Sequence, residues 1–295
     1  MDQAEQLRNI IKAGNVKRSR PLARVITVTS GKGGVGKSNT AINLAIQFRK
    51  MGKKVVILDA DFGLANIEIM FGAVPKNNIS DLIYQGKNIK DIITWGPMEV
   101  GFISGGSGIT GLSNLSKDYL TYIVHNLAEL DTIADVIIVD TGAGISDAVL
   151  EFLVASGEIL LVTTPEPTSI TDSYSLLKAL NGHPGLERDN TQICMIANRV
   201  SAANEGEVLF QKLDVVVSRY LKLPITYLGA VPQDPLLAKA VMQQLPVSLQ
   251  NPQARSAQAY EEIAAKLMKQ DEGQNTQKRG VAAFFSHIIG KRNNG

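Results

Sequence analysis

Short runs of valine, isoleucine and leucine alternate along this chain with longer segments whose apolar residues recur at helical spacing. The short runs predict strands at residues 25–29, 55–58, 136–139, 159–163, 193–197 and 225–228. Helical spacing is clear at residues 117–130 and 254–268. The alternation predicts an α/β three-layer sandwich with a mostly parallel sheet, whose strands are apolar throughout because helices cover both faces.

The same pattern predicts the domain boundaries. One folded domain spans residues 25–268, and the sequence KQDEGQNTQ at 269–277 predicts a linker because it lacks apolar residues. Residues 1–24 and 278–292 are then separate terminal segments. We predict a loop for the glycine-rich residues 101–111, which follow a strand. No apolar run approaches the roughly 20 residues of a membrane-spanning helix, and the polar N-terminus has no export signal, so we expect a cytoplasmic protein.

The charge distribution separates the body of the protein from its ends. The net charge of +2 includes +4 from residues 1–24 and +4 from residues 275–295, which leaves −6 for the rest. We therefore expect no nucleic-acid partner, because such proteins usually carry a basic face. The single cysteine, Cys194, lies in an apolar run and predicts a buried thiol.

A phosphate-binding motif follows the first predicted strand and opens a helix that we expect to end near Lys50. The sequence GKGGVGKS matches the P-loop pattern, in which backbone N–H groups surround phosphate oxygens. Lys37 is expected to pair with the outer phosphates of ATP, and the Ser38 hydroxyl to bind Mg²⁺. The predicted nucleotide-binding residues here are Gly31, Gly33, Gly34, Val35, Gly36, Lys37, Ser38 and Asn39.

With Lys32 at its second position, this motif resembles the deviant Walker A ATPases, the group that includes MinD and ParA. The resemblance implies that Lys32 crosses a dimer interface and reaches the phosphates bound by the partner subunit, so that ATP drives homodimerisation. The alternative is a solvated loop lysine. A second cation beside a triphosphate is the electrostatic assistance that phosphoryl transfer uses.

Acidic residues end two of the predicted strands, and ligands bind at this edge of α/β sheets. The resemblance implies that Asp61 positions the attacking water, that Asp59 lies near the metal's water shell, and that Asp140 is the Walker B aspartate. It implies a slow, Mg²⁺-dependent ATPase. The loop after Asp140 has Gly142 where the group often has proline, which leaves the stiffness of the loop open.

Two later segments resemble the adenine-binding parts of the group. They contribute Asn198 and Arg199 after one strand, and Pro232 and Asp234 after another. The alternative for each segment is an ordinary turn, which these residue types favour.

The C-terminal segment has the pattern of an amphipathic helix. Its apolar residues recur at i, i+3, i+4, i+7 and i+8 between flanking cations, which is typical of a helix that lies on an anionic membrane. The expected membrane residues are Val281, Phe284, Phe285, Ile288 and Ile289. The alternative is a terminal helix that docks on its own domain, and both states can belong to one protein.

Residues 1–24 favour one branch of the group. Iron–sulfur ATPases need cluster cysteines, and the tyrosine kinases of this superfamily end in a tyrosine cluster, which this chain lacks. The opening DQAEQLR resembles the FlhG family, MinD-like ATPases that control flagellar number and placement. That resemblance implies that Gln3, Leu7 and Arg8 contact the GTPase FlhF and stimulate it, and that flagellar basal-body proteins are further partners. MinD-like division-site ATPases and ParA-like DNA-segregation ATPases remain the alternatives.

Overall fold

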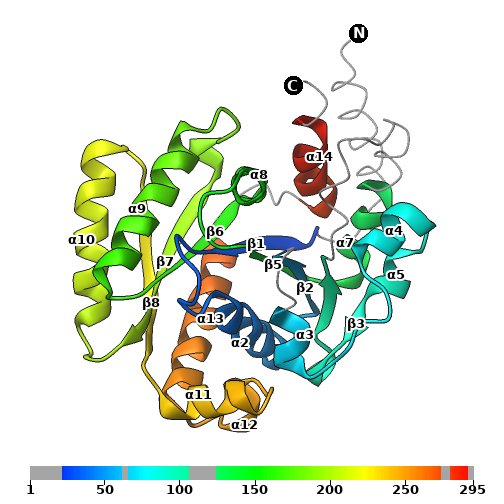
Figure 1. Ribbon diagram of the computed structural model, residues 1–295, viewed down its shortest axis with the longest axis horizontal. Helices are drawn as coiled ribbons and strands as arrows, with labels where there is room; N and C mark the ends of the chain where they lie inside the picture. Colours follow the sequence, from blue (N-terminus) through cyan, green and yellow to red (C-terminus); the bar gives the residue numbers. More distant parts are fainter. Residues whose placement is uncertain (1–21, 62–65, 106–123, 274–279, 292–295) are drawn as a thin grey trace.

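The computed structural model describes residues 22–61, 66–105, 124–273 and 280–291, and the side chains of residues 271–273 and 289–291 are outside this description. Within these residues the chain forms one eight-stranded sheet with helices on both faces (Figure 1). The strands are β1 (Arg24–Thr29), β2 (Val55–Ala60), β3 (Thr94–Trp95), β4 (Gly101–Ser104), β5 (Val136–Thr141), β6 (Glu158–Thr163), β7 (Gln192–Val200) and β8 (Thr226–Pro232). The predicted three-layer α/β sandwich is confirmed.

The sheet order is β3-β4-β2-β5-β1-β6-β7-β8, and every pair is parallel except β3 with β4. The carboxyl ends of β1, β2 and β5 therefore meet at one edge near the middle of the sheet. Chemistry that the sequence distributes over more than 100 residues is brought together there.

Helices cover both faces of the sheet. They are α2 (Lys37–Lys50), α3 (Asn66–Phe71), α4 (Ile79–Gln85), α5 (Ile89–Ile92), α7 (Leu130–Ile133), α8 (Asp147–Ala155), α9 (Pro167–Gly182), α10 (Glu205–Tyr220), α11 (Pro235–Met242), α12 (Val247–Gln250), α13 (Arg255–Gly273) and α14 (Val281–Lys291), with short 3-10 turns at Pro97–Glu99 and Arg188–Asn190.

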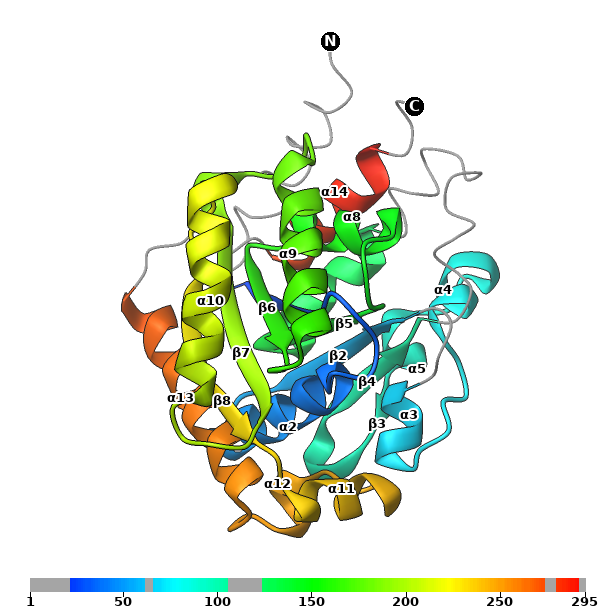
Figure 2. The same cartoon turned by 60° about the vertical axis from the view of Figure 1, so that its left-hand side comes forward.

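Among the described residues, three apolar clusters make up the core. One face of the sheet packs against α2 and α13. The other face packs against α4, α5, α8 and α14 at one end and against α9 and α10 at the other (Figure 2). Cys194 lies in the first cluster, and burial raises the pKa of its thiol to about 12, which confirms the predicted core cysteine.

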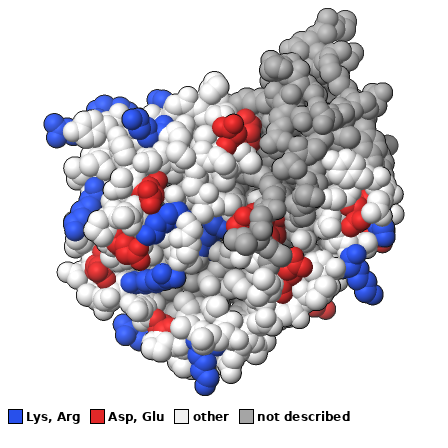
Figure 3. All heavy atoms as spheres, viewed as in Figure 1, with Lys and Arg blue, Asp and Glu red and all other residues white. Residues whose placement is uncertain are grey.

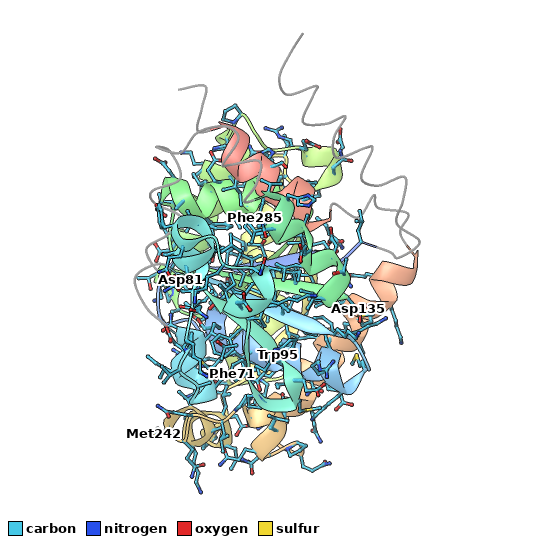
Figure 4. The ribbon with its side chains drawn as sticks, turned by 90° about the vertical axis from the view of Figure 1, so that its right-hand side faces the viewer. Phe71, Asp81, Trp95, Asp135, Met242 and Phe285 are labelled. Carbon is cyan, nitrogen blue, oxygen red and sulfur yellow. The ribbon has the colours of Figure 1, made fainter. Side chains whose placement is uncertain are left out.

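The structure corrects two boundaries and leaves a third partly outside the described residues. The predicted loop at 101–111 begins with strand β4, so that prediction was wrong for Gly101–Ser104. A Cβ at Gly101 would lie 3.0 Å from Ile93 and Val56, so the glycine allows close packing rather than a turn. Figure 4 shows Trp95, on the edge strand β3, and Phe71, on α3, close to one another at the edge of the sheet next to β4. Helix α13 continues to Gly273, five residues into the predicted linker, and the predicted helix at 117–130 is described only from residue 124.

Candidate functional site

The P-loop connects β1 to α2, as the sequence predicts. Gly34 and Gly36 have φ angles of 78° and 95°, a region that side chains with a Cβ rarely adopt. A Cβ on Gly31 would lie 2.2 Å from the backbone of Asp172, and one on Gly36 would lie 2.2 Å from the Asn198 amide. The loop therefore needs glycine both for its conformation and for the close approach of its neighbours.

The first residue of α2 forms a buried ion pair with the end of β5. Lys37 Nζ lies 2.9 Å from Asp140 Oδ1, and both side chains are buried. Ser38 also hydrogen-bonds to the Asp140 carboxylate. Burial raises the pKa of Asp140, while Lys37 and Ser38 oppose this shift. The second oxygen, Oδ2, is buried and has no hydrogen-bond partner among the residues that the structure describes.

This arrangement fits a magnesium ion and a triphosphate. A hydroxyl and a carboxylate with an unused oxygen are the hard oxygen donors that Mg²⁺ takes, directly or through water. In a P-loop the glycine N–H groups and the lysine contribute the positive charge that phosphate oxygens need. Among the described residues, no cluster of three His, Cys, Asp or Glu side chains could hold a metal by itself, so phosphate oxygens and water would complete the coordination.

Asp59 lies beside Asp140 because β2 pairs with β5 in a register that places them opposite one another. Its oxygens accept hydrogen bonds from the N–H groups of Asp61, at 3.1 Å, and Ile67, at 3.3 Å. Burial, followed by the charge of Asp140, raises the pKa of Asp59 to about 7. Asp59 thus fixes the start of α3 and places a second carboxyl group next to Asp140.

Asp61 is half-buried and points toward the loop after β5. Its Oδ2 accepts a 3.3 Å hydrogen bond from the Asn66 amide, and its Oδ1 would lie 3.8 Å from a Cβ on Gly142. The loop is tied to the P-loop strand, since Gly144 N–H donates to the Ser30 carbonyl at 3.0 Å. The Asp61 carboxylate therefore lies next to the loop after β5, which is itself hydrogen-bonded to the end of the P-loop strand.

Lys32 forms contacts inside its own subunit. Its Nζ donates to Glu166 Oε2 at 2.5 Å and to Thr168 Oγ1 at 2.9 Å, at the start of α9. This pairing lowers the pKa of the exposed Glu166 carboxyl. Sequence reasoning did not identify Glu166 or Thr168. Both follow β6, which pairs with β1, so the rule that ligands bind at strand ends was a usable signal.

The predicted adenine residues divide into two groups. Asn198 Nδ2 donates to the Val35 carbonyl and Arg199 Nη2 to the Gly34 carbonyl, each at 2.7 Å, so the end of β7 holds the P-loop. Arg199 has a φ of 59°. Pro232 ends β8 beside Val200. The Asp234 carboxylate accepts hydrogen bonds from Leu236 N–H and from Ser256, so it has the turn role that the sequence left open as the alternative.

The predicted membrane residues pack against the domain. Val281, Phe284, Phe285 and Ile288 are at most 3% exposed, and the Phe284 ring lies 6.0 Å from that of Phe152 on α8. The Ile289 side chain, and the partner residues Gln3, Leu7 and Arg8, lie outside the described residues. None of the described helices has the length and apolar character needed to cross a bilayer.

Comparison with known proteins identifies the family of this chain. Residues 21–268 match the ParA family, described as NUBPL iron-transfer P-loop NTPase. The antiactivator FleN of Pseudomonas aeruginosa is 38% identical over 83% of this chain and 86% of its own. The flagellum site-determining protein YlxH of Helicobacter pylori is 33% identical over 98% of both chains.

The fold is also that of solved relatives. The septum site-determining protein MinD complexed with Mg-ADP from Pyrococcus horikoshii superposes with a TM-score of 0.67 at 22% identity, over 85% of this chain and 98% of that one. Because the family match covers most of the chain and both flagellar relatives exceed 30% identity, the protein belongs to the MinD/ParA family of P-loop ATPases, in its FlhG and FleN branch.

Proposed function

We propose that this protein is an ATP-dependent switch that dimerises, associates with the membrane and controls the number and placement of flagella. The observation that carries the proposal is the pairing of the P-loop Lys37 with Asp140, beside Ser38 and Asp61, in a chain that matches a flagellum site-determining protein over 98% of both lengths. ATP and Mg²⁺ are the proposed ligands.

Each residue has a separate task in slow hydrolysis. The glycines and Lys37 hold the phosphates, while Ser38 and Asp140 hold the metal, with Asp59 adding charge behind them. When bound, Mg²⁺ neutralises charge that develops on the phosphates. Asp61 orients the attacking water. Because Asp61 is held by Asn66 and faces the Gly142 loop, a movement of that loop changes how well the water is aligned.

Dimerisation depends on Lys32. In the monomer its ammonium is partly exposed and bound to Glu166, so it can change partners at a small energetic cost. In the ATP-bound dimer we expect Lys32 to contact the phosphates of the partner subunit. ATP then joins two subunits, and hydrolysis separates them.

Membrane association depends on α14. An eleven-residue helix gives weak attachment by itself, so two copies on one dimer bind an anionic lipid surface much more tightly than one. The protein would therefore be peripheral at the inner face of the membrane when ATP-bound, and α14 would be docked on its own domain in the monomer.

The proposed protein partners are the GTPase FlhF, through Gln3, Leu7 and Arg8, and flagellar basal-body proteins. The second candidate is a MinD-like division-site ATPase, favoured by the MinD fold. DNA segregation of the ParA kind is disfavoured by charge, because the face in Figure 3 carries Lys and Arg intermixed with Asp and Glu.

A peptide of residues 1–24 tests the flagellar assignment. It is expected to stimulate GTP hydrolysis by purified FlhF, and Gln3→Ala is expected to abolish this stimulation, because a glutamine can orient the attacking water in a GTPase. Gln6→Ala, in the same segment, is the matched control and should retain it. If the peptide has no effect on FlhF, the division-site function becomes the better assignment.

A further inference from the structure

One buried carboxylate joins the two ends of the folded chain. Asp131, on α7, is 6% exposed. Its Oδ1 accepts a hydrogen bond from the N–H of Ala23 at 3.2 Å and another from the N–H of Val281 at 3.1 Å. Ala23 immediately precedes β1, and Val281 is the first residue of α14. The same oxygen therefore holds the point where the N-terminal segment enters the domain and the start of the C-terminal helix.

Packing around this oxygen leaves little room. A Cβ on Gly280 would lie 2.9 Å from Asp131 Oδ2 and 3.0 Å from Leu22 Cδ2. Leu22 thus lies against Gly280, and Gly280 lies directly against the carboxylate. Ala23 also belongs to the apolar cluster that contains Val281, Phe284 and Phe285. The two chain ends are packed together as well as hydrogen-bonded to one group.

This geometry has an energetic consequence in both directions. If α14 leaves its groove, Leu22 loses its contact with Gly280 and the Asp131 carboxylate becomes open to water, which weakens the hold on Ala23. If Leu22 is pulled away instead, water reaches the bond between Asp131 and Val281. A buried hydrogen-bonded carboxylate is more stable than one that has lost a donor, so each release favours the other.

We propose that Asp131 couples Leu22 and Ala23 to α14, so that a ligand that draws α14 away from the domain also weakens the hold on the backbone at Ala23. The coupling is a property of residues 22–23, 131 and 280–281. Its use rests on the proposed function: an anionic lipid surface that takes α14 would then increase access of the GTPase partner to the N-terminal segment, and the partner would favour lipid binding by the same factor.

Hydrogen exchange by mass spectrometry, on the full chain without lipid or GTPase, tests the coupling. Leu22→Ser leaves the sequence of α14 unchanged, and we expect it to speed exchange at residues 281–285 about fivefold. Asp131→Ala should speed exchange about tenfold both there and at Ala23. Combined in one chain, the two changes should give less than the product of their separate effects, since they break one connection.

Asp135→Ala is the matched control. The Asp135 carboxylate also accepts a backbone hydrogen bond, from Lys54 N–H, and its main-chain bond to Arg24 is unaffected by the change. It should leave residues 281–285 at the wild-type rate. If Asp131→Ala does not fold, Asp131→Asn supplies the same comparison with a smaller acceleration. The proposal would be overturned if Leu22→Ser exchanged at the wild-type rate at residues 281–285. It would also be overturned if the accelerations caused by Leu22→Ser and Asp131→Ala multiplied in the combined variant, as they do for independent sites.

A second measurement separates this coupling from the proposed function. With ATP and phosphatidylglycerol vesicles, exchange at Ala23 should accelerate in the wild-type protein and change little in Asp131→Ala, where the bond is already lost. If the exchange effects of Leu22→Ser and Asp131→Ala are non-additive in solution but vesicles change nothing, the coupling stands and lipid is rejected as the ligand of α14. Independent effects in solution would reject the coupling and leave the ATPase and flagellar proposals standing.

Discussion

The ammonium of Lys32 lies 2.5 Å from the Glu166 carboxylate of the same subunit. Lys32, which we expect to contact the phosphates of the neighbouring subunit, is thus bound to a residue of its own subunit in this structure. Lys32→Ala should remain monomeric with ATP while it still binds nucleotide, because Lys37 and the glycines remain. Glu166→Gln keeps the cation and should still form dimers. Light scattering with and without ATP measures both. A nucleotide-independent mass for the wild-type protein would contradict the model of an ATP-bridged dimer.

Holding the phosphates and orienting the water are separate tasks in this site. Asp61→Ala should bind ATP normally and lose turnover, because its carboxylate is hydrogen-bonded to the Asn66 amide, whereas Lys37 pairs with Asp140. Nucleotide titration and phosphate release measure the two properties. Equal hydrolysis by wild type and Asp61→Ala would refute the assignment.

The Lys37→Ala variant should lose ATP binding and also stability. It leaves the buried Asp140 without its counter-charge, and breaking a buried pair typically costs roughly 3–5 kcal/mol. Urea unfolding and nucleotide titration should therefore be run together. Lys32→Ala is the control, since its ion pair is exposed and should change the free energy of unfolding little. Wild-type stability of Lys37→Ala would show that Asp140 finds another partner.

The raised pKa of Asp59 should make the stability of the protein depend on pH. Its pKa is about 7 in the folded protein and 3.8 in the unfolded chain, so between these values the folded state binds more protons. The free energy of unfolding should consequently fall as pH rises through this window. The loss is of the order of a few kcal/mol and is complete above pH 7.

Asp59→Asn should reduce that slope, because its side chain stays neutral. Thermal unfolding between pH 5 and pH 8, without nucleotide or Mg²⁺, measures the difference, with Asp135→Asn as an exposed control. If Asp59→Asn loses as much stability as the wild type over this range, the carboxylate is already ionised in the folded protein.

Because α14 is packed against the domain, changes in this helix should affect the stability of the protein as well as its membrane binding. Phe284 is 1% exposed, so Phe284→Ala should lower the free energy of unfolding of the free protein by roughly 3–5 kcal/mol. Deletion after Gln277 should leave ATP-dependent dimers that no longer sediment with anionic liposomes. Undiminished sedimentation of the truncated protein would mean that another surface binds lipid.

The strands and the P-loop were predictable because they depend on local information. The run at residues 136–139 is apolar at every position, as a parallel strand covered by helices on both faces requires, and the glycine spacing of the P-loop fits its backbone. Strand β4 was missed because it begins with a glycine, which usually indicates a loop. Gly101 is needed here because Val56 and Ile93 pack closely against it, and the local sequence does not reveal these contacts.

By itself, the sequence determined the fold class, the phosphate site and the amphipathic character of the C-terminal segment, since each follows from spacing along the chain. Only the tertiary structure decided what these groups touch. In the folded chain Lys32 pairs with Glu166, the Asp234 carboxylate accepts a hydrogen bond from Ser256, and Phe284 is buried against Phe152. An apolar helical face fits lipid and protein equally well, so burial depends on which surface lies within reach, and that is set by the packing of α8 and the position of Asp131.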